Sequence, residues 1–272
     1  MNPKLQRRVQ RYGWDRAADH YELYWRKQLE PAQARLLEMA ELQPGEHVLD
    51  VSCGTGMVTF PAADRVGREG RVLGTDISQA MIEIARKEAA RRNLSHVTFE
   101  RMDAEELEVE DGGFDAALNS LGLMFIPDVG KAFREMHRAL RPGGRAVAAV
   151  WGERKRCGWA EIFPIVDARV ESEVCPLFFQ LGTGDTMRRR LEDAGFTDVV
   201  LDRIATFLRY DSPQAALGAV LQGGAMALAY SRFDEPTRDE VHAEYLASIE
   251  PYRQGTDYQV PAEFVVAQGR KK

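Results

Sequence analysis

The segment His47–Gly56 carries the pattern with the clearest chemical meaning in this sequence. An apolar stretch leads into Asp50, and Gly54 and Gly56 follow before a stretch with helical periodicity. Glycines at such a turn let the backbone approach a ligand, because they lack a Cβ and adopt positive φ at little cost. A helix that begins there offers unpaired N–H groups in its first turn. The segment therefore predicts a ligand-binding turn at the end of a strand.

A second carboxylate, Asp76, stands at the end of the next predicted strand, directly before Ile77 and Ser78. In a doubly wound sheet this position faces the crevice beside the first turn, where a carboxylate accepts hydrogen bonds from ribose hydroxyls. The simpler interpretation is that Asp76 only caps the following helix. The pairing of this acid with the glycine turn favours a nucleoside ligand.

The charge of Asp50 separates two nucleoside cofactors that fit this geometry. A dinucleotide would place its anionic pyrophosphate over the glycine turn, where a carboxylate repels it. S-adenosylmethionine has no phosphate and brings a cationic sulfonium and an ammonium to the same place. The dinucleotide spacing Gly-x-Gly-x-x-Gly also fails, because its third glycine would fall on Thr59. Charge complementarity therefore favours S-adenosylmethionine.

Near-continuous apolar runs alternate with stretches of helical periodicity along most of the chain, which is typical of a parallel sheet covered on both faces. The strands are predicted at His47–Val51, Arg71–Thr75, Val97–Arg101, Phe114–Asn119, Arg145–Trp151, Val199–Leu208 and Gln259–Gly269. The helices are predicted at Ala17–Lys27, from Pro31 to Pro44, and at Met57–Val66, Gln79–Arg92, Val129–Leu140, Thr186–Ala194 and Ser212–Ile249. We interpret residues 1–272 as a single domain. Within it we expect an N-terminal helical lid at 1–44, a cofactor-binding core at 45–152, and the remaining sheet at 153–272 with a helical insertion at about 212–250.

With these motifs in order, the sequence resembles the class I S-adenosylmethionine-dependent methyltransferases. Within that class it is similar to the small-molecule group of type 11 and ubiquinone-biosynthesis-like enzymes. The resemblance is strong from Pro44 to Trp151, fair through Gly269 and vague before Pro31. It implies a Rossmann-like sheet of seven strands, mostly parallel with the last antiparallel, with helices on both faces and a helical lid. It also implies S-adenosyl-L-methionine as cofactor and S-adenosyl-L-homocysteine as product.

The resemblance assigns cofactor contacts residue by residue. The family's acid-and-glycine motif falls on Asp50–Gly56, with Ser52 where the first glycine usually lies. The family's ribose acid falls on Asp76, with Ile77 beside the adenine and Met81 packing on it. Met81 also has helical spacing with Ile82, so core packing alone would explain it.

Two further segments belong to the same set of implied contacts. Asp103–Ala104 falls where the family contacts the adenine, so the Asp103 carboxylate would accept from the adenine amino group. The simpler interpretation is that Asp103 caps the segment that starts at Ala104. Asn119 would supply a backbone carbonyl or amide at the methionine end, within Asn119–Gly122. This segment differs from the Asn-Pro-Pro-Tyr pattern, which argues against planar amines of nucleic-acid bases as acceptors.

Aromatic residues near the N-terminus are candidates for contacts above the cofactor. Tyr21 and Trp25 lie four residues apart, hence on one helix face, and could close over the cofactor. Docking of the helix onto the domain would explain this face equally well. Tyr21 and His242 are the candidates for a catalytic role, although a lone histidine on a helix is more often structural. Methyl transfer needs a base only when the acceptor arrives protonated and weakly acidic, and no catalytic dyad is visible.

Composition limits the remaining choices. The 36 basic and 42 acidic residues give a formal charge of −6, which argues against nucleic acid as a partner. No stretch reaches the ~20 apolar residues of a membrane helix, and no His/Cys/Asp cluster has zinc-like spacing. The 3 cysteines are widely spaced, so we expect a soluble protein of the reducing cytoplasm. The predicted partner is a small-molecule methyl acceptor, and a homodimer is left open.

Two rival functions stay open at this point. One is an NAD(P)-dependent oxidoreductase, which would share the strand–turn–helix unit. The other is a non-catalytic nucleoside-binding protein that resembles a methyltransferase but has no acceptor pocket. A cavity beside the sulfonium position would distinguish the enzyme from this second rival.

Overall fold

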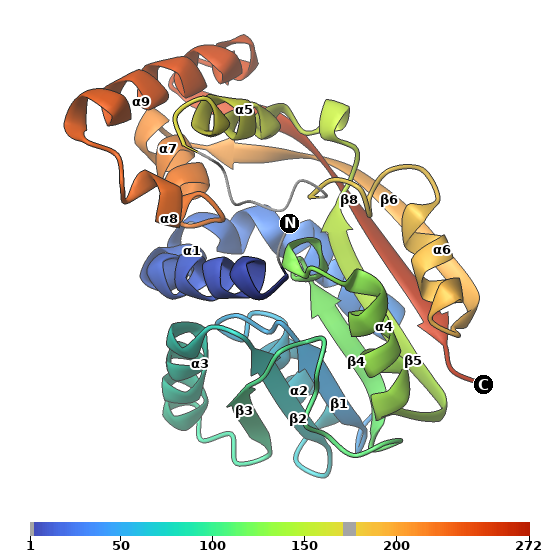
Figure 1. The fold of residues 1–272 in the computed structure, drawn as a ribbon. Coiled ribbons are helices and arrows are strands. Elements are labelled where there is room, and N and C mark those ends of the chain that lie inside the picture. Colours follow the sequence, from blue (N-terminus) through green and yellow to red (C-terminus); the bar gives the residue numbers. More distant parts are fainter. Residues whose placement is uncertain (1–2, 171–177) are drawn as a thin grey trace.

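The computed structural model describes residues 3–170 and 178–272. These residues form one eight-stranded sheet with helices around it (Figure 1). The strand order is β3-β2-β1-β4-β5-β8-β6, and β7 pairs with β8 alone. The strands are His47–Val51 (β1), Arg71–Asp76 (β2), Val97–Arg101 (β3), Phe114–Ser120 (β4), Leu140–Trp151 (β5), Thr197–Tyr210 (β6), Arg253–Gln254 (β7) and Asp257–Arg270 (β8). β1 to β5 pair in parallel, and β8 is antiparallel to both β5 and β6. The predicted Rossmann-like sheet is confirmed, and the two-residue β7 is an addition that the sequence did not indicate.

The strand order reverses at β1, because β2 and β3 lie on one side of it and β4 and β5 on the other. In open α/β sheets, ligands bind outside the carboxyl ends of the strands at this switch point. The two strands that flank the reversal are anchored firmly: Leu49 of β1 and Leu118 of β4 are fully buried. The fold therefore holds the ends of β1 and β4 rigidly where the sequence predicts the ligand.

The helices surround this sheet. They are Pro3–Ala40 (α1), Thr59–Val66 (α2), Gln79–Arg91 (α3), Val129–Ala139 (α4), Ile162–Asp167 (α5), Thr186–Asp193 (α6), Pro213–Leu221 (α7), Ala227–Tyr230 (α8) and Glu235–Ile249 (α9). α3 packs on β2 and β3, α4 on β4 and β5, and α6 on β6 and β8. Figure 1 shows α1 running between the part of the molecule with α2 and α3 and the group formed by α5, α7, α8 and α9.

The N-terminal region differs from the prediction of two helices separated at Pro31. α1 is one continuous helix of 38 residues with Pro31 inside it. Pro31 removes one backbone N–H and disfavours the preceding turn. Buried side chains on both sides of it, Leu29 and Ala32, pack into the same core. Burial of this apolar face on both sides of the proline therefore holds the helix together.

The region after β6 is also divided differently from the predicted insertion. The stretch Ser212–Ile249 forms three helices, α7, α8 and α9, instead of one helical block. The break between α7 and α8 falls at Gly223 and Gly224, and a Cβ on Gly223 would come within 3.2 Å of the Trp25 ring of α1. The helix α5 and the strand β7 were not predicted, because each is too short to give a periodic signal.

Candidate functional site

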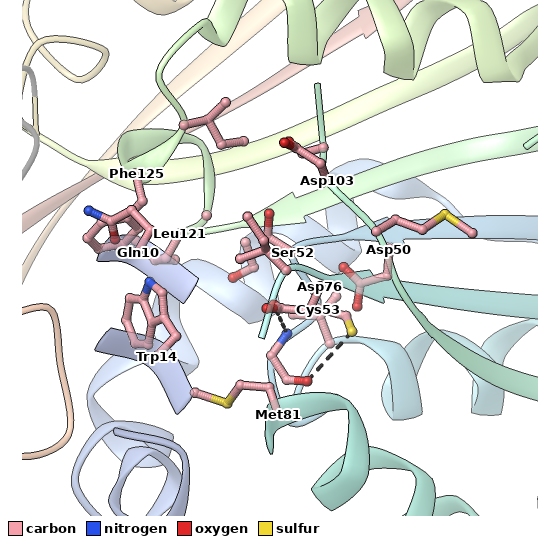
Figure 2. A pocket seen from close by; sticks show the side chains of 18 of the residues that line it. Gln10, Trp14, Asp50, Ser52, Cys53, Asp76, Met81, Asp103, Leu121 and Phe125 are labelled. Carbon is pink, nitrogen blue, oxygen red and sulfur yellow. Dashed lines mark hydrogen bonds between the residues drawn. The ribbon is translucent and has the colours of Figure 1, made fainter. Parts of the chain in front are cut away.

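A cavity lies under α1 at the carboxyl ends of β1 and β2 and beside the loops that follow β3 and β4, and its empty space, open solvent included, is about 890 Å³. It is lined by Arg7, Gln10, Trp14, Tyr21, Gln33, Asp50, Ser52, Cys53, Gly54, Met57, Val58, Asp76, Ile77, Met81, Met102, Asp103, Ala104, Ser120, Leu121, Gly122, Phe125, Ile126 and Pro127. We call this the first cavity. Figure 2 shows Asp50, Cys53 and Asp76 on one side of it and Trp14 and Phe125 on the other. Most of the residues predicted to hold a cofactor therefore meet in one place.

The turn after β1 has the backbone conformation that its glycines suggested. Gly54 has φ +56° and Ser52 has φ +58°, so both lie in the left-handed region. A serine there is strained relative to glycine, because it carries a Cβ. A Cβ on Gly122 would come within 2.3 Å of the Ser52 Cβ. The loops after β1 and β4 therefore pack against each other at the wall of the first cavity.

Asp50 is fully buried at the end of β1. Its Oδ2 accepts a hydrogen bond of 2.6 Å from the Thr59 hydroxyl, while its Oδ1 has no partner among the described residues. Burial raises the pKa of Asp50 to about 7, the Thr59 hydrogen bond opposes this rise, and the charge of Asp76 adds to it. A buried carboxylate without a counter-charge is costly. A cationic group in the first cavity would relieve that cost, and a phosphate would increase it.

Asp76 holds the glycine turn against the start of α3. Its Oδ2 accepts from the Gly54 N–H at 2.9 Å and its Oδ1 from the Ser78 N–H at 2.8 Å. Burial raises the pKa of Asp76 to about 6, although these backbone hydrogen bonds lower it. The cap of α3 is Ser78, whose hydroxyl accepts from the Met81 N–H. The helix cap is therefore supplied by a different side chain, and Asp76 lines the first cavity beside Ile77 and Met81.

Asp103, in the loop after β3, forms an ion pair with a residue of α1. Its Oδ2 forms an ion pair of 2.9 Å with Arg7 Nε, and its Oδ1 accepts from the Glu105 N–H. Arg7 also pairs with the buried Glu105. Asp15 makes a second link farther along α1, accepting from the Ser78 hydroxyl at 2.7 Å and the Ala80 N–H at 3.1 Å. Polar contacts of Arg7 and of Asp15 therefore hold α1 over the cavity.

Side chains of α1 form the cover of the first cavity. The Tyr21 ring lies 3.7 Å from where a Cβ on Gly54 would stand, so it faces the glycine turn. Arg7, Gln10 and Trp14 line the same cavity but were not among the predicted cofactor contacts. Their spacing of three and four residues places them on one helix face with Tyr21, and this periodicity was the signal that could have identified them.

Four predicted contacts lie outside the lining of the first cavity. Gly56 shapes the turn: its N–H donates to the Cys53 carbonyl, and a Cβ there would meet the Phe60 ring at 2.6 Å. Asn119 is fully buried, and its side chain donates to the Val51 carbonyl at 2.8 Å and accepts from the N–H groups of Gly122 and Leu123. The asparagine therefore orients the loop after β4, and Ser120–Gly122 line the first cavity in its place.

Trp25 and His242 are the other two predicted residues that lie outside the lining of the first cavity. The Trp25 indole donates to the Ala219 carbonyl at 3.1 Å and lines a different cavity. His242 lies on α9, where its Nε2 is 3.0 Å from the Tyr230 hydroxyl, and it lines neither cavity. The four-residue spacing of Tyr21 and Trp25 correctly placed both side chains on one face of α1, where both line the second of the two cavities. It could not show that only Tyr21 also lines the first cavity.

A second cavity, whose empty space with open solvent included is about 480 Å³, adjoins the first. It is lined by Trp14, Tyr21, Trp25, Leu29, Leu121, Met124, Phe125, Trp151, Trp159, Ile162, Phe163, Phe178, Val220, Gly224, Ala225 and Met226. Trp14, Tyr21, Leu121 and Phe125 line both cavities. The edge of the Trp14 ring meets Tyr21 with ring centroids 5.6 Å apart and Phe125 with centroids 5.0 Å apart. The three rings therefore form the boundary between the two cavities.

Other chemistry is limited in the part of the chain that the structure describes. Within residues 3–170 and 178–272, no group of three or more His, Cys, Asp and Glu side chains is placed to hold a metal ion. In the same residues, no helix combines the length and the apolar character needed to cross a membrane. Burial raises the pKa of the Cys53 thiol well above its usual range, so it stays protonated. Cys175 lies outside the described residues.

Fold and cavity together define a Rossmann-like α/β protein whose switch point is lined by buried carboxylates. Residues 48–144 match the family model described as a methyltransferase domain, which confirms the predicted resemblance at that level. The chain is 38% identical over 132 residues to the aklanonic acid methyltransferase DauC of Streptomyces sp. (strain C5), covering 48% of this chain and 60% of that protein. It is 32% identical over 139 residues to a demethylmenaquinone methyltransferase of Listeria monocytogenes, covering 51% of this chain and 56% of that protein.

The matched segment therefore spans only about three fifths of the length of these relatives. Among solved structures, the chain is similar to phosphoethanolamine N-methyltransferase 2 of Haemonchus contortus in complex with phosphomonomethylethanolamine and S-adenosylhomocysteine. That likeness has a TM-score of 0.63 and 18% sequence identity, and it covers 95% of this chain and 58% of that one. It shows a shared fold.

Proposed function

We propose that this chain is an S-adenosylmethionine-dependent methyltransferase that methylates a small organic acceptor by in-line displacement. The observation that carries the proposal is the buried Asp50, whose Oδ1 is unpartnered among the described residues at the wall of the first cavity. The match of residues 48–144 to a methyltransferase domain and the small-molecule relatives support it. The complex of the Haemonchus neighbour with S-adenosylhomocysteine agrees with the choice of cofactor.

In this proposal each carboxylate of the first cavity faces a different part of the cofactor. Asp50 faces the cationic methionine end together with the loop Ser120–Gly122. Asp76 keeps acceptor capacity for the ribose hydroxyls beyond the two backbone N–H groups that it already binds. Ile77 and Met81 pack on the adenine, and Asp103–Ala104 border its amino edge.

When bound, S-adenosylmethionine supplies a methyl group on a sulfonium, which is already an excellent leaving group. The protein's contribution is then to orient the acceptor and exclude water, which can supply on the order of 7–11 kcal/mol in favourable cases. α1 provides this enclosure through its ion pair with Asp103 and its contacts to the start of α3. Tyr21 closes the glycine turn, and burial, Asp76 and Glu22 raise its pKa, so it remains a neutral phenol.

Calorimetric titration tests the proposal against a dinucleotide-dependent oxidoreductase. S-adenosylhomocysteine is expected to bind the wild-type chain, and NAD⁺ is not, because Asp50 would face its pyrophosphate. Binding of NAD⁺ without binding of S-adenosylhomocysteine would overturn the assignment. Asp50→Asn should weaken S-adenosylhomocysteine, whereas Asp64→Asn, an exposed aspartate on α2, serves as the matched control and should not.

A further inference from the structure

The two parts of α1 on either side of Gly13 are attached to the molecule by different forces. Beyond Gly13 the helix buries a series of apolar side chains, among them Leu36. In residues 4–12, which we call the first segment, the buried side chains are Gln6 and Gln10, and both are polar. Burial of apolar surface is the main favourable contribution to packing. The first segment is therefore attached more weakly than the rest of α1.

The contacts that hold the first segment are polar and incomplete. Arg7 forms an ion pair of 2.9 Å with Asp103 and a second one with the buried Glu105. By contrast, Gln6 Nε2 and Arg11 Nε are buried without a hydrogen-bond partner among the described residues. A buried polar group that is left unpaired costs free energy. Movement of the segment away from the cavity would return these groups to water, so the ion pairs of Arg7 carry most of its attachment.

Gly13 stands between these two parts and is the one glycine of α1. Inside a helix, glycine is less favourable than alanine by an amount equal to roughly a fivefold change in an equilibrium constant, because its backbone gains more freedom when the helix unwinds. Space does not require a glycine here, since the nearest atom to an added Cβ would be the Leu228 Cβ at 3.9 Å. Conformation does not require it either, because φ of Gly13 is not positive. Its effect is to weaken the helix at this point.

The helix is attached again directly beyond Gly13. Asp15 accepts hydrogen bonds from the Ser78 hydroxyl at 2.7 Å and from the Ala80 N–H at 3.1 Å, at the start of α3. Pro31, the other position that could break the helix, has buried apolar side chains on both sides. The helix can therefore open at Gly13 without disturbing the core.

The first segment covers one end of the first cavity. Its Arg7 and Gln10 line this cavity, as do Asp103 and Ala104 in the loop after β3. The ring that faces the glycine turn, Tyr21, belongs to the part of α1 beyond Gly13. Opening of the first segment would therefore expose the Asp103 end of the cavity and leave the glycine turn covered.

We propose that residues 4–12 are a gate that opens about Gly13, that the ion pairs of Arg7 hold it closed, and that the cofactor enters and leaves the first cavity through it. The moving part is then much smaller than the lid expected at 1–44. Passage of the cofactor rests on the proposed function, whereas the opening of the gate does not.

Hydrogen exchange of the unliganded full chain tests the opening. The amides of residues 8–12 should exchange at least tenfold faster than those of residues 20–30, because a segment with little apolar burial opens more readily. Gly13→Ala should slow exchange in 8–12 about fivefold, in line with the preference of helices for alanine. Gly113→Ala is the matched control, since a Cβ there would meet the Glu110 carbonyl oxygen at an ordinary 3.6 Å. Equal exchange on both sides of Gly13 would overturn the proposal.

Binding kinetics provide the second test, because a helix end can fray without controlling a ligand. Stopped-flow fluorescence of Trp14, which lines the first cavity, follows S-adenosylhomocysteine. Gly13→Ala should lower its association and dissociation rate constants about fivefold each and leave Kd unchanged, because the ligand passes the same open state in both directions. Gly113→Ala should change neither rate constant. Wild-type rate constants in Gly13→Ala would show fraying without a gate and overturn the proposal.

The outcomes separate the gate from the proposed function. Failure of S-adenosylhomocysteine to bind the wild-type chain would overturn the proposed function and the passage of the cofactor. Hydrogen exchange of the unliganded chain would still support or refute opening at Gly13. Normal binding with a dissociation rate constant that falls alone, and a tighter Kd, would show that Gly13→Ala acts on the bound complex and would overturn the gate only.

Discussion

The two cavities beneath α1 share a wall of aromatic rings, yet they are built from different parts of the chain. The first takes its polar groups from the ends of β1 and β2 and from the loop after β3: Asp50, Asp76 and Asp103. The second takes its rings from α1, from the segment after β4, from the end of β5 and from residues 159, 163 and 178, while the stretch 220–226 adds aliphatic, glycine and methionine residues. Polarity therefore comes from a strand-and-turn unit, and apolar shape from the helices that cover it. The charge of the first cavity and the apolar shape of the second can therefore be altered separately.

Removal of the Asp76 side chain is expected to have the largest effect. Asp76→Ala leaves the N–H groups of Gly54 and Ser78 without their acceptor and removes the proposed ribose contact. S-adenosylhomocysteine binding should weaken by ~1–3 kcal/mol, about 5- to 150-fold. Calorimetry measures this, with circular dichroism to verify folding. An unchanged affinity in Asp76→Ala would contradict the assignment of Asp76 to the ribose.

Neutralising Asp50 should have a somewhat smaller effect. Asp50→Asn keeps the shape and the Thr59 contact but removes the negative charge facing the first cavity. We expect S-adenosylmethionine to bind about tenfold more weakly, or ~1.4 kcal/mol, as measured by calorimetry. Asp64→Asn should be neutral. An unchanged affinity in Asp50→Asn would remove the electrostatic basis of the cofactor assignment.

Loosening α1 should affect the rate of cofactor release. Arg7→Ala leaves the buried Glu105 without its ion pair and frees Asp103. We expect dissociation of S-adenosylhomocysteine to accelerate several-fold, about 1 kcal/mol, in stopped-flow fluorescence. Arg8→Ala, at an exposed position one residue along α1, is the matched control. Equal rates in the two variants would show that this ion pair does not hold the cover closed.

The pH dependence of stability should be the subtlest signature. Asp50 and Asp76 have pKa values raised to about 7 and about 6, above the ~4 of an unfolded aspartate. Between these values the folded chain binds more protons than the unfolded chain, so these two groups lower stability as pH rises from about 4 to about 7. In thermal melts across this range, Asp50→Asn should lose part of the wild-type slope. A slope identical to that of the wild type would argue that Asp50 titrates normally.

The sequence was sufficient for the strand-end side of the first cavity because the residues there follow local rules. An acid ending a buried strand, glycines in the next turn and a second acid after the next strand specify a switch point wherever the sheet forms. Ser78, two residues after that second acid, caps α3. Local reasoning did not reach the side chain of Asn119, because the family pattern concerned only its backbone, and this side chain is a buried brace for the loop after β4.

The second cavity could be seen only in three dimensions. Trp25 and Trp159 meet although about half of the sequence separates them, and Trp25 also packs on Gly223, where a Cβ would come within 3.2 Å of its ring. Pro31 argued locally for a break, yet the apolar burial on both sides of it outweighed that preference. Short-range spacing sets backbone geometry and charge at a strand end, whereas the shape of an apolar cavity is the sum of distant packing choices that no single segment encodes.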